Sequence, residues 1–518
     1  RSGFPEKIGG WIKDKGMEAA TAPYNTFVSS GTNTSLQPTS GSFWGVCRSM
    51  WNWLNLTGYN LLGVGTNLKY YVQNGSGSEF NDITPIRYTS TSVASAFTTD
   101  TSKNSGGKTE VTVNDTGHGA QTNDFVMINP LSTTLNGAIT SSATSIILTS
   151  ATGFPSAGSI FIGTECITYS GISTNTLTGC TRGTNGTTAA AHSSGDTVYA
   201  APNGVLVNGE YQITYKSSST YAISVTGTAT ASSTPAVSAS FYYQLTTGSD
   251  IYTTGVGWGA GGWGGATTGY SSTGWGSPAS AGLGVGIQLR LWSEANFGQD
   301  LIINPRGGEL YYWAVNTNPN IYDRAQKLYP SVTVTTSTGT FTPDASCPTI
   351  CNYVLVSDAS RFVIAYGCND YGGSTLDPLL VRWSDQESAA TWTPAITNQA
   401  GSYRLSQGSK IITAQQTRQE ILVWTDAAVY SMQYVGAPYV WSFQIMGSNT
   451  SLISPNATAT ANNVTYWMGT DKFYMYSGRV ETLPCTLRQY VFDDINLQQA
   501  DQFFASTNEG YNEVWFFY

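Results

Sequence analysis

A hairpin pattern recurs along the chain and constrains the fold more than any other feature of the sequence. Each copy is an apolar strand, a short polar turn and an aromatic strand, and the copies span residues 60–72, 301–315, 361–384, 420–435 and 464–484. Such runs predict antiparallel hairpins. Because polar and apolar residues alternate only loosely, we expect several strands to be buried on both faces. Repeated small sheets predict a β-propeller of about six blades, either complete or incomplete, and a large β-sandwich is the alternative.

The composition supports an all-β fold. Charged residues make up 11% of the chain, against about 25% in an average soluble domain. A long-helix or coiled-coil protein needs more Glu, Lys and Arg than this, so that class is excluded. Aromatic residues make up 13%, which provides ample surface to bury and argues against disorder. We therefore expect a globular protein rich in strands and turns.

The net charge limits the partners that this chain can bind. It carries 23 Lys and Arg against 32 Asp and Glu, a formal charge of -9. A protein that grips nucleic acid by neutralising phosphates is basic. Tight DNA or RNA binding is therefore excluded, whereas a wall that surrounds DNA without holding it is not. No stretch approaches 18 consecutive apolar residues, so we expect no membrane-spanning segment.

The middle of the chain differs in composition from its two ends. From about residue 91 to residue 250 the aromatics give way to Thr, Ser, Gly and Ala. This change predicts an inserted β domain, with a nested hairpin module at about residues 131–201. Residues 251–288 are rich in Gly and Trp and predict an irregular connection. Residues 1–90 and 289–518 would then form the two parts of the propeller.

Cysteine and histidine are too scattered for a metal site or a disulfide framework. The 7 cysteines run from Cys47 to Cys485 without a C-x-x-C pair, and the only histidines are His118 and His192. A structural zinc site needs four such ligands close together. We expect mostly buried free thiols in a protein made in a reducing cytosol, and no cofactor. The chain starts at Arg1 without Met or a signal peptide, which favours a trimmed or processed form.

The residues that could carry catalysis have simpler structural roles. A glycosidase needs two facing carboxylates, and four lie close in sequence, but their neighbours indicate turns: Asp370, Asp377, Asp385 and Glu387. His118 lies between glycines and His192 lies in a loop, without a G-x-S-x-G elbow. Sialidase-like propellers carry an S/T-x-D-x-G-x-x-W/F turn, and the Thr-Asp turns here lack that spacing. The sequence therefore identifies no catalytic, cofactor-binding or metal-ligating residue.

Three other motifs have plain explanations. The G-x-G-x-x-G match at residues 257–262 does not join a strand to a helix, so it does not predict dinucleotide binding. The N-x-[ST] sites arise by chance in a chain this rich in Asn, Ser and Thr; they include Asn55, Asn114, Asn456 and Asn463. Exposed aromatics could stack on sugars or bases, but we expect the following to be strand core: Tyr311, Tyr312, Trp313 and Tyr474.

Several blocks of sequence, in order, resemble one known family. They are SGFPEKIGGW (residues 2–11), GVGTNLKYYV, DLIINPRGGELYYW, DPLLVRWSDQES, the segment 401–436, the segment 464–494 and NEVWFFY. Together they are similar to the tail nozzle proteins of short-tailed bacteriophages, also called tail tubular protein B. The resemblance covers the first ninety residues and nearly everything from Leu289 onward. The middle segment resembles FCCH-like and small hairpin modules of phage structural proteins.

The resemblance implies a structural virion protein. Such a subunit carries a β-propeller and assembles in the host cytoplasm into a sixfold ring of the virion tail. The ring lies below the tail adaptor ring, is able to contact tail fibres, and extends a DNA channel that retains the genome and then opens for ejection. The family is not enzymatic. Copies that each carry a charge of -9 would repel DNA, which suits a channel that passes a duplex without binding it.

Two other functions fit parts of the sequence. A host-receptor or fibre-anchoring component is favoured by the Thr- and Ser-rich insertion at residues 91–250. A propeller enzyme acting on surface polysaccharide would need a carboxylate pair such as Asp370 and Asp377. The sequence pattern does not assign the channel-lining residues.

Overall fold

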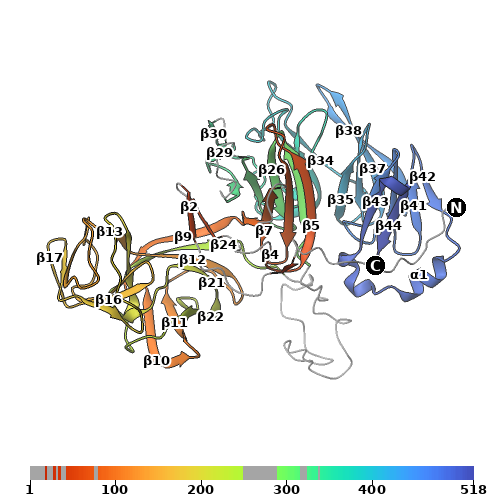
Figure 1. The fold of residues 1–518 in the computed structure, drawn as a ribbon. Helices are drawn as coiled ribbons and strands as arrows, with labels where there is room; N and C mark the ends of the chain where they lie inside the picture. The colour runs from red at the N-terminus through yellow and green to blue at the C-terminus, as the bar shows by residue number, and fades with distance from the viewer. Residues whose placement is uncertain are drawn as a thin grey trace, which may run out of the picture.

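The computed structural model describes residues 18–19, 27–30, 33–36, 42–74, 80–248, 289–315, 324–336 and 339–518. These residues form an all-β protein, and the predicted fold class, a β-propeller with about six blades, is confirmed (Figure 1). The predicted Gly- and Trp-rich connection at residues 251–288 lies outside the described residues.

Five blades are antiparallel sheets of four strands that follow one another along the chain. Blade 1 is β5 (Cys47–Leu54), β6 (Asn60–Thr66), β7 (Tyr70–Asn74) and β8 (Phe80–Asp82). Blade 2 is β25 (Trp292–Phe297), β26 (Asp300–Pro305), β27 (Leu310–Trp313) and β28 (Gln326–Leu328). Blade 3 is β31 (Cys351–Val356), β32 (Val363–Asn369), β33 (Leu376–Trp383) and β34 (Gly401–Arg404). Blade 4 is β35 (Ile411–Gln416), β36 (Ile421–Thr425), β37 (Ala428–Gly436) and β38 (Val440–Ser448). Blade 5 is β39 (Thr458–Ala461), β40 (Val464–Met468), β41 (Phe473–Tyr476) and β42 (Val480–Leu483).

The sixth blade contains two strands in the described part of the chain, β43 (Phe504–Asn508) and β44 (Glu513–Phe517), joined by η4 (Glu509–Tyr511). The chain reaches it through α1 (Arg488–Asp494) and η3 (Leu497–Gln502). A small ribbon of β29 (Val334–Thr336) and β30 (Gly339–Phe341) lies between blades 2 and 3 in sequence. Before blade 1, β1 (Glu18–Ala19) pairs with β4 (Ser42–Phe43), and β2 (Phe27–Ser30) pairs with β3 (Asn33–Leu36).

The five hairpins that the sequence predicts are the second and third strands of the five complete blades. These strands lie inside each sheet and between neighbouring sheets, so they are apolar on both faces. Every residue of β26, β32 and β36 is buried. The aromatic residues expected to be strand core are buried too: Tyr311, Tyr312, Trp313 and Tyr474.

A repeated turn joins the second and third strands of blades 1 and 4. The Thr66 hydroxyl oxygen accepts a hydrogen bond from Lys69 N at 2.8 Å, and the Thr425 hydroxyl oxygen accepts one from Ala428 N at 2.9 Å. The next side chain then anchors the segment that enters the blade: Asn67 Oδ1 accepts from Val46 N at 2.8 Å, and Asp426 Oδ1 from Ser409 N at 2.7 Å. The polar turn residues therefore satisfy backbone donors, as Thr, Asn and Asp do in turns.

Large aromatic side chains hold neighbouring blades together. Trp53 of blade 1 meets Trp313 of blade 2 edge to face, with ring centroids 6.2 Å apart. Trp424 of blade 4 meets Trp467 of blade 5 in the same way at 5.6 Å. Both residues of the second pair are fully buried. Edge-to-face pairs add stability beyond the area that they bury, which explains the high Trp content of this propeller.

The segment from Ile86 to Gln244, here called the insertion, extends from the propeller between β8 and β25 (Figure 1). Two of its four-stranded sheets are β10-β11-β23-β22 and β21-β12-β24-β9, and the others are a five-stranded and a three-stranded sheet. One continuous apolar cluster runs through all of them. Its strands are β9 (Ile86–Val93), β10 (Phe97–Ser105), β11 (Lys108–Asn114), β12 (Phe125–Pro130), β13 (Ser132–Thr134), β14 (Ser145–Ile147), β15 (Gly158–Ile162), β16 (Glu165–Tyr169), β17 (Gly171–Ser173), β18 (Thr176–Thr178), β19 (Thr181–Thr184), β20 (Thr197–Ala201), β21 (Gly209–Gln212), β22 (Thr214–Ser217), β23 (Thr220–Thr226) and β24 (Ala239–Gln244), with η2 (Pro202–Gly204) after β20.

Candidate functional site

The carboxylates considered as a catalytic pair hold turns and strands in blade 3. Asp377 forms an ion pair with Arg404 at 2.7 Å and accepts a hydrogen bond from Leu379 N at 3.0 Å. Asp385 Oδ1 accepts from Gln386 N at 2.9 Å and from Gln399 N at 2.8 Å. These contacts use the carboxylate oxygens within the blade. They give the two residues the structural role that their sequence context indicates.

Both histidines belong to polar contacts inside the insertion. His118 is buried, its Nδ1 accepts a hydrogen bond from Ala120 N at 3.0 Å, and its ring meets the ring of Tyr221 edge to face at 5.1 Å. His192 Nε2 lies 2.8 Å from Glu165 Oε2. Neither histidine therefore lies beside a Ser or Cys nucleophile in these contacts.

Glu165 is the centre of the second of these clusters. Its oxygens accept hydrogen bonds from Arg182 Nε at 2.8 Å and Nη2 at 2.7 Å, and from the backbone of Gly183 at 2.9 Å and Ala190 at 3.1 Å. Burial alone would raise the pKa of Glu165, but these donors and His192 outweigh it and lower the pKa to about 2. The cluster ties the loop at residues 182–192 to β16.

The cysteines are free thiols, and five of the seven are buried. Burial raises the pKa of the Cys368 thiol to about 12, so this thiol is inert as a nucleophile. Within the described ranges, no group of three or more His, Cys, Asp or Glu side chains is placed to hold a metal ion. No helix in the same ranges is long and apolar enough to cross a membrane.

A small cavity lies where residues in or beside the first strands of blades 2 to 5 come together. The cavity there measures about 10 Å³, and its walls include Trp292, Arg306, Tyr353, Ile412 and Asn456. A space of that size holds at most about one water molecule. A DNA duplex therefore does not fit into this cavity.

Arg306, which lines this cavity, also forms an ion pair with Asp501. Arg306, in the turn between β26 and β27, places Nη2 2.6 Å from Asp501 Oδ2 and Nη1 3.2 Å from Asp501 Oδ1. Asp501 lies in η3, immediately before blade 6. The pair joins two blades that are distant in sequence, and its two-point geometry is the strong form of an Arg–carboxylate contact.

A carboxylate with a raised pKa lies on the first strand of blade 2. Glu294 Oε1 accepts a hydrogen bond from Tyr70 Oη of blade 1 at 3.3 Å. Burial raises the pKa of Glu294 to about 7, although hydrogen bonds from Ser49 and Tyr70 oppose the change. This carboxylate therefore changes charge close to neutral pH.

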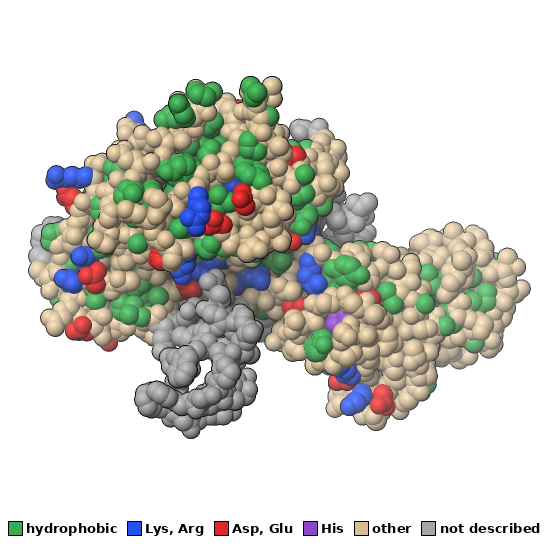
Figure 2. Space-filling view, turned by 180° about the vertical axis from the view of Figure 1, so that it is seen from behind, with side chains coloured by type: hydrophobic (Ala, Val, Ile, Leu, Met, Phe, Trp, Pro, Cys, Tyr) green, Lys and Arg blue, Asp and Glu red, His purple; other side chains and the backbone are tan. Residues whose placement is uncertain are grey.

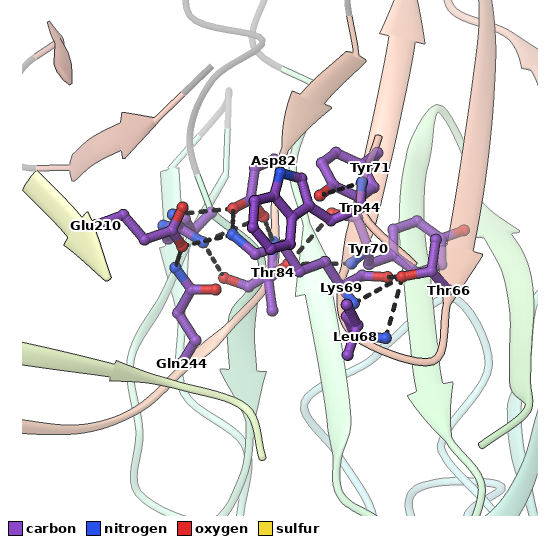
Figure 3. Close-up of polar contacts among 11 residues, drawn as sticks. Trp44, Thr66, Leu68, Lys69, Tyr70, Tyr71, Asp82, Thr84, Glu210 and Gln244 are labelled. Carbon is purple, nitrogen blue, oxygen red and sulfur yellow. Dashed lines mark hydrogen bonds and ion pairs between the residues drawn. The ribbon is translucent and has the colours of Figure 1, made fainter. Parts of the chain in front are cut away.

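The most strongly built polar site is the joint between the propeller and the insertion, shown in Figure 3. Lys69 Nζ lies 2.8 Å from Asp82 Oδ2 in blade 1 and 2.5 Å from Glu210 Oε1 in β21 of the insertion. Arg324, just before β28 of blade 2, lies 3.3 Å from Asp82 Oδ1. Gln244, at the end of β24, donates a hydrogen bond to Glu210. The joint, defined as these five residues, connects blade 1, blade 2 and the insertion.

Burial makes the charges of the joint interdependent. The four ionised side chains are 2–5% exposed, and two cations balance two anions. Burial alone would raise the pKa of Asp82, but Arg324 and Lys69 outweigh it and lower the pKa to about 2. The Lys69 ammonium also lies 4.5 Å from the centre of the Phe125 ring in the insertion. Because a buried charge without its partner is costly, the joint fixes how the insertion is attached to the propeller.

Sequence reasoning missed the joint. Lys69 and Glu210 are separated by 141 positions, and Asp82 and Arg324 by 242. No local motif connects residues so far apart. The one signal in the sequence is that Lys69 interrupts an otherwise uncharged hairpin, and an isolated charge among strand residues indicates a buried partner as readily as an exposed turn.

Comparisons with known proteins give little further guidance. No protein-family model matches the sequence, and no curated protein does. One solved structure to which the chain is similar is Phage phi92 endosialidase, with 10% sequence identity and a TM-score of 0.21. The match covers 82% of this chain and 52% of that chain, so this chain spans about half the length of that protein. A TM-score this low does not establish a shared topology.

Proposed function

We propose that this chain is a structural subunit of a phage tail, of the nozzle type, whose copies form a ring around a DNA channel. The observation that carries the proposal is the placement of the nozzle-like sequence blocks. The blocks GVGTNLKYYV, DLIINPRGGELYYW and DPLLVRWSDQES, and the segments 401–436 and 464–494, build successive blades of one propeller. The resemblance therefore follows the architecture of the protein in chain order.

The small size of the cavity between blades 2 to 5 supports a channel that lies between copies rather than within one copy. The cavity measures about 10 Å³, and Arg306 in its wall pairs with Asp501. A ring of propellers, each a rigid wall element, leaves its opening at the symmetry axis of the assembly. The charge of -9 on each copy keeps the wall from holding phosphates, so DNA passes through the opening without specific contacts.

Electron microscopy of the purified full-length chain tests this proposal. We expect sixfold rings with a central opening of duplex width, together with no retention of duplex DNA at about 0.15 M salt. Labelled protein in intact virions should lie on the tail axis below the adaptor. A stable monomer, or a position on the outside of the tail, would contradict the proposal.

A receptor-binding or fibre-anchoring role is the second candidate, and the projecting insertion favours it. The joint holds the insertion at a fixed position on the propeller, as a recognition domain requires. In this case, purified full-length protein incubated with host cells should bind them and reduce later phage adsorption. Rings that form without any effect on adsorption would favour the nozzle role instead.

A further inference from the structure

The joint holds a lysine amine between two carboxylates. Lys69 Nζ lies 2.5 Å from Glu210 Oε1 and 2.8 Å from Asp82 Oδ2 (Figure 3). A carbon–oxygen bond is about 1.2–1.3 Å long, so the carboxyl carbon of Glu210 is within about 4 Å of Nζ. Reacting groups held this close react as if their concentration were about 10⁵–10⁸ M. The joint therefore keeps a nucleophile beside an electrophile.

The two carboxylates differ in what else they contact. Arg324 Nη1 and Nη2 each lie 3.3 Å from an oxygen of Asp82. Burial would raise the pKa of Asp82, but Arg324 and Lys69 lower it to about 2. Among the residues that the structure describes, no second cation pairs with Glu210, which also accepts a hydrogen bond from Gln244. When Lys69 gives up a proton, Glu210 therefore receives it and Asp82 stays ionised.

The surroundings of the joint favour a neutral product. The four ionised side chains of the joint are 2–5% exposed. The Phe125 ring lies 4.5 Å from Lys69 Nζ, and the Trp44 ring packs edge to face on Phe125 at 5.5 Å. Hydration stabilises an ammonium and a carboxylate in water, whereas burial makes both charges costly. Converting the two groups into a neutral amide removes that cost.

We propose that Lys69 and Glu210 condense to an amide that covalently joins blade 1 to the insertion. The Lys69 ammonium passes one proton to Glu210 Oε1, which leaves a neutral amine and a carboxylic acid. Nζ then attacks Glu210 Cδ, so the N–C bond forms and the bond from Cδ to Oε1 breaks. Asp82 takes the second proton from Nζ and returns it to the departing hydroxyl. One water is released, Asp82 is again a carboxylate, and no co-reactant is consumed.

Gln244 assists the departure of the hydroxyl. Its side-chain amide donates a hydrogen bond to Glu210 Oε1, the oxygen that leaves. A donor aimed at that oxygen stabilises the negative charge that develops on it. The resulting amide links residues 141 positions apart, and like a disulfide it restricts the unfolded chain. The reaction follows folding, because only the folded protein brings these residues together.

Two other Lys–Glu pairs serve as matched controls within the same chain. Lys327 Nζ lies 2.6 Å from Glu309, and Lys216 Nζ lies 2.8 Å from Glu110. The side chains of these pairs are about 27–41% exposed, and charged groups of opposite sign lie side by side on the surface in Figure 2. In the described ranges neither Nζ has a second carboxylate within ion-pair distance. We expect no amide at either pair, although their distances match that of the joint.

Tryptic peptide mapping by mass spectrometry tests the proposal on the full-length wild-type protein. An amide at Lys69 blocks cleavage there, so peptide 49–87 should be joined to peptide 183–216. The joined peptide should weigh about 18 Da less than its two parts, the mass of one water. It should accumulate while the folded protein is incubated for hours to days, and should not form in protein kept unfolded in urea.

The same digest shows which group reacts. If the folded wild-type protein yields only peptides 49–69, 70–87 and 183–216, the proposal is wrong. If peptide 49–87 is lighter by one water and joined to nothing, Asp82 is the electrophile. If peptide 49–87 is joined to 217–290 with loss of ammonia, the electrophile is Gln244. Either of these two results overturns the assignment to Glu210.

Two variants test the assigned roles. Lys69→Arg keeps the positive charge but has no primary amine, so the joined peptide should be absent. Asp82→Asn should slow the joining of 49–87 to 183–216 about a hundredfold, because the base is lost. A folded Asp82→Asn protein that joins as fast as the wild type would remove Asp82 from the reaction. The mass measurement does not depend on ring formation, so this proposal and the proposed function can fail separately.

Discussion

Arg306 and Asp501 join blade 2 directly to the segment that leads into blade 6, through contacts of 2.6 Å and 3.2 Å. The sixth blade has only two strands in the described part of the chain, so it has fewer internal pairings than the others. A contact from another blade therefore contributes a larger share of the stability of this blade than it would for a complete blade.

Asp501→Asn should loosen the sixth blade without unfolding the protein. The pair is partly exposed, with side chains 14% and 21% accessible, so we expect a cost of about 1 kcal/mol. Amide hydrogen exchange in β43 and β44 should accelerate about fivefold, while exchange in blades 3 and 4 stays unchanged. Asp493→Asn on α1 is the control, because its carboxylate is exposed. If amide hydrogen exchange in β43 and β44 is equally fast in the Asp501→Asn and Asp493→Asn variants, the Arg306–Asp501 pair does not stabilise the sixth blade.

The joint should be far more sensitive to substitution than a surface ion pair. Lys69→Met leaves the buried Glu210 carboxylate with Gln244 alone, and we expect a loss of about 3–5 kcal/mol in the free energy of unfolding. Lys69→Met combined with Glu210→Gln removes one charge of each sign and should recover part of that loss. Urea denaturation followed by tryptophan fluorescence measures both.

Lys216→Met is the comparison for the joint. Lys216 pairs with Glu110 at 2.8 Å, but both side chains are about 40% exposed. A surface pair of this kind contributes about 0–1 kcal/mol. Similar losses in Lys69→Met and Lys216→Met would show that the joint is not a stability-determining contact.

The hairpins could be predicted from the sequence, whereas the joint could not. The hairpin at residues 420–435 is encoded locally, because Thr425 and Asp426 form the turn and the flanking strands are apolar throughout. Such short-range chemistry predicted the middle strands of five blades. The joint depends on Lys69 and Glu210 meeting across 141 positions, and no short-range rule encodes that.

The exposure of Leu56 could not be predicted for a different reason. Leu56 lies two residues from the strand residue Leu54 and three residues from the core residue Trp53, so its apolar character predicts burial. The turn formed by Asn55 instead places Leu56 in solvent. The domain boundaries at residues 90, 250 and 288 stay predictions.

Glu165 should make the insertion sensitive to acid. Its pKa is lowered from 4.5 to about 2 in the folded protein. Stability from this group is therefore present above about pH 4.5 and is lost as the pH falls toward 2. The shift corresponds to about 3 kcal/mol. Glu165→Gln should lower the free energy of unfolding at pH 7 by an amount of that order, and its difference from wild type should shrink between pH 4.5 and pH 2. A difference that does not change over this range would contradict the assignment.

Glu294 predicts the opposite dependence on pH. Its pKa is raised to about 7, from an ordinary value of 4.5. The folded state therefore prefers the protonated acid, and stability is lost as the pH rises from about 4.5 to 7. Because the side chain is partly exposed, we expect a loss of about 2 kcal/mol, less than the full shift would give. Glu294→Gln removes the charge and keeps the shape, so it should stabilise the protein at pH 8 and leave it unchanged at pH 4.

Thermal unfolding of the Glu294→Gln variant and the wild type between pH 4 and pH 8 checks this prediction. Tyr70→Phe is the control for the hydrogen bond, because it removes the hydroxyl that donates to Glu294 at 3.3 Å. That hydrogen bond lowers the pKa of Glu294, so its loss should raise this pKa further. At pH 8 the Glu294 carboxylate should therefore destabilise the Tyr70→Phe variant more than it destabilises the wild-type protein. If Glu294→Gln is less stable than the wild type at pH 8, the carboxylate is ionised and favourably held in the folded state, and its assignment as an acid that titrates near neutral pH is wrong.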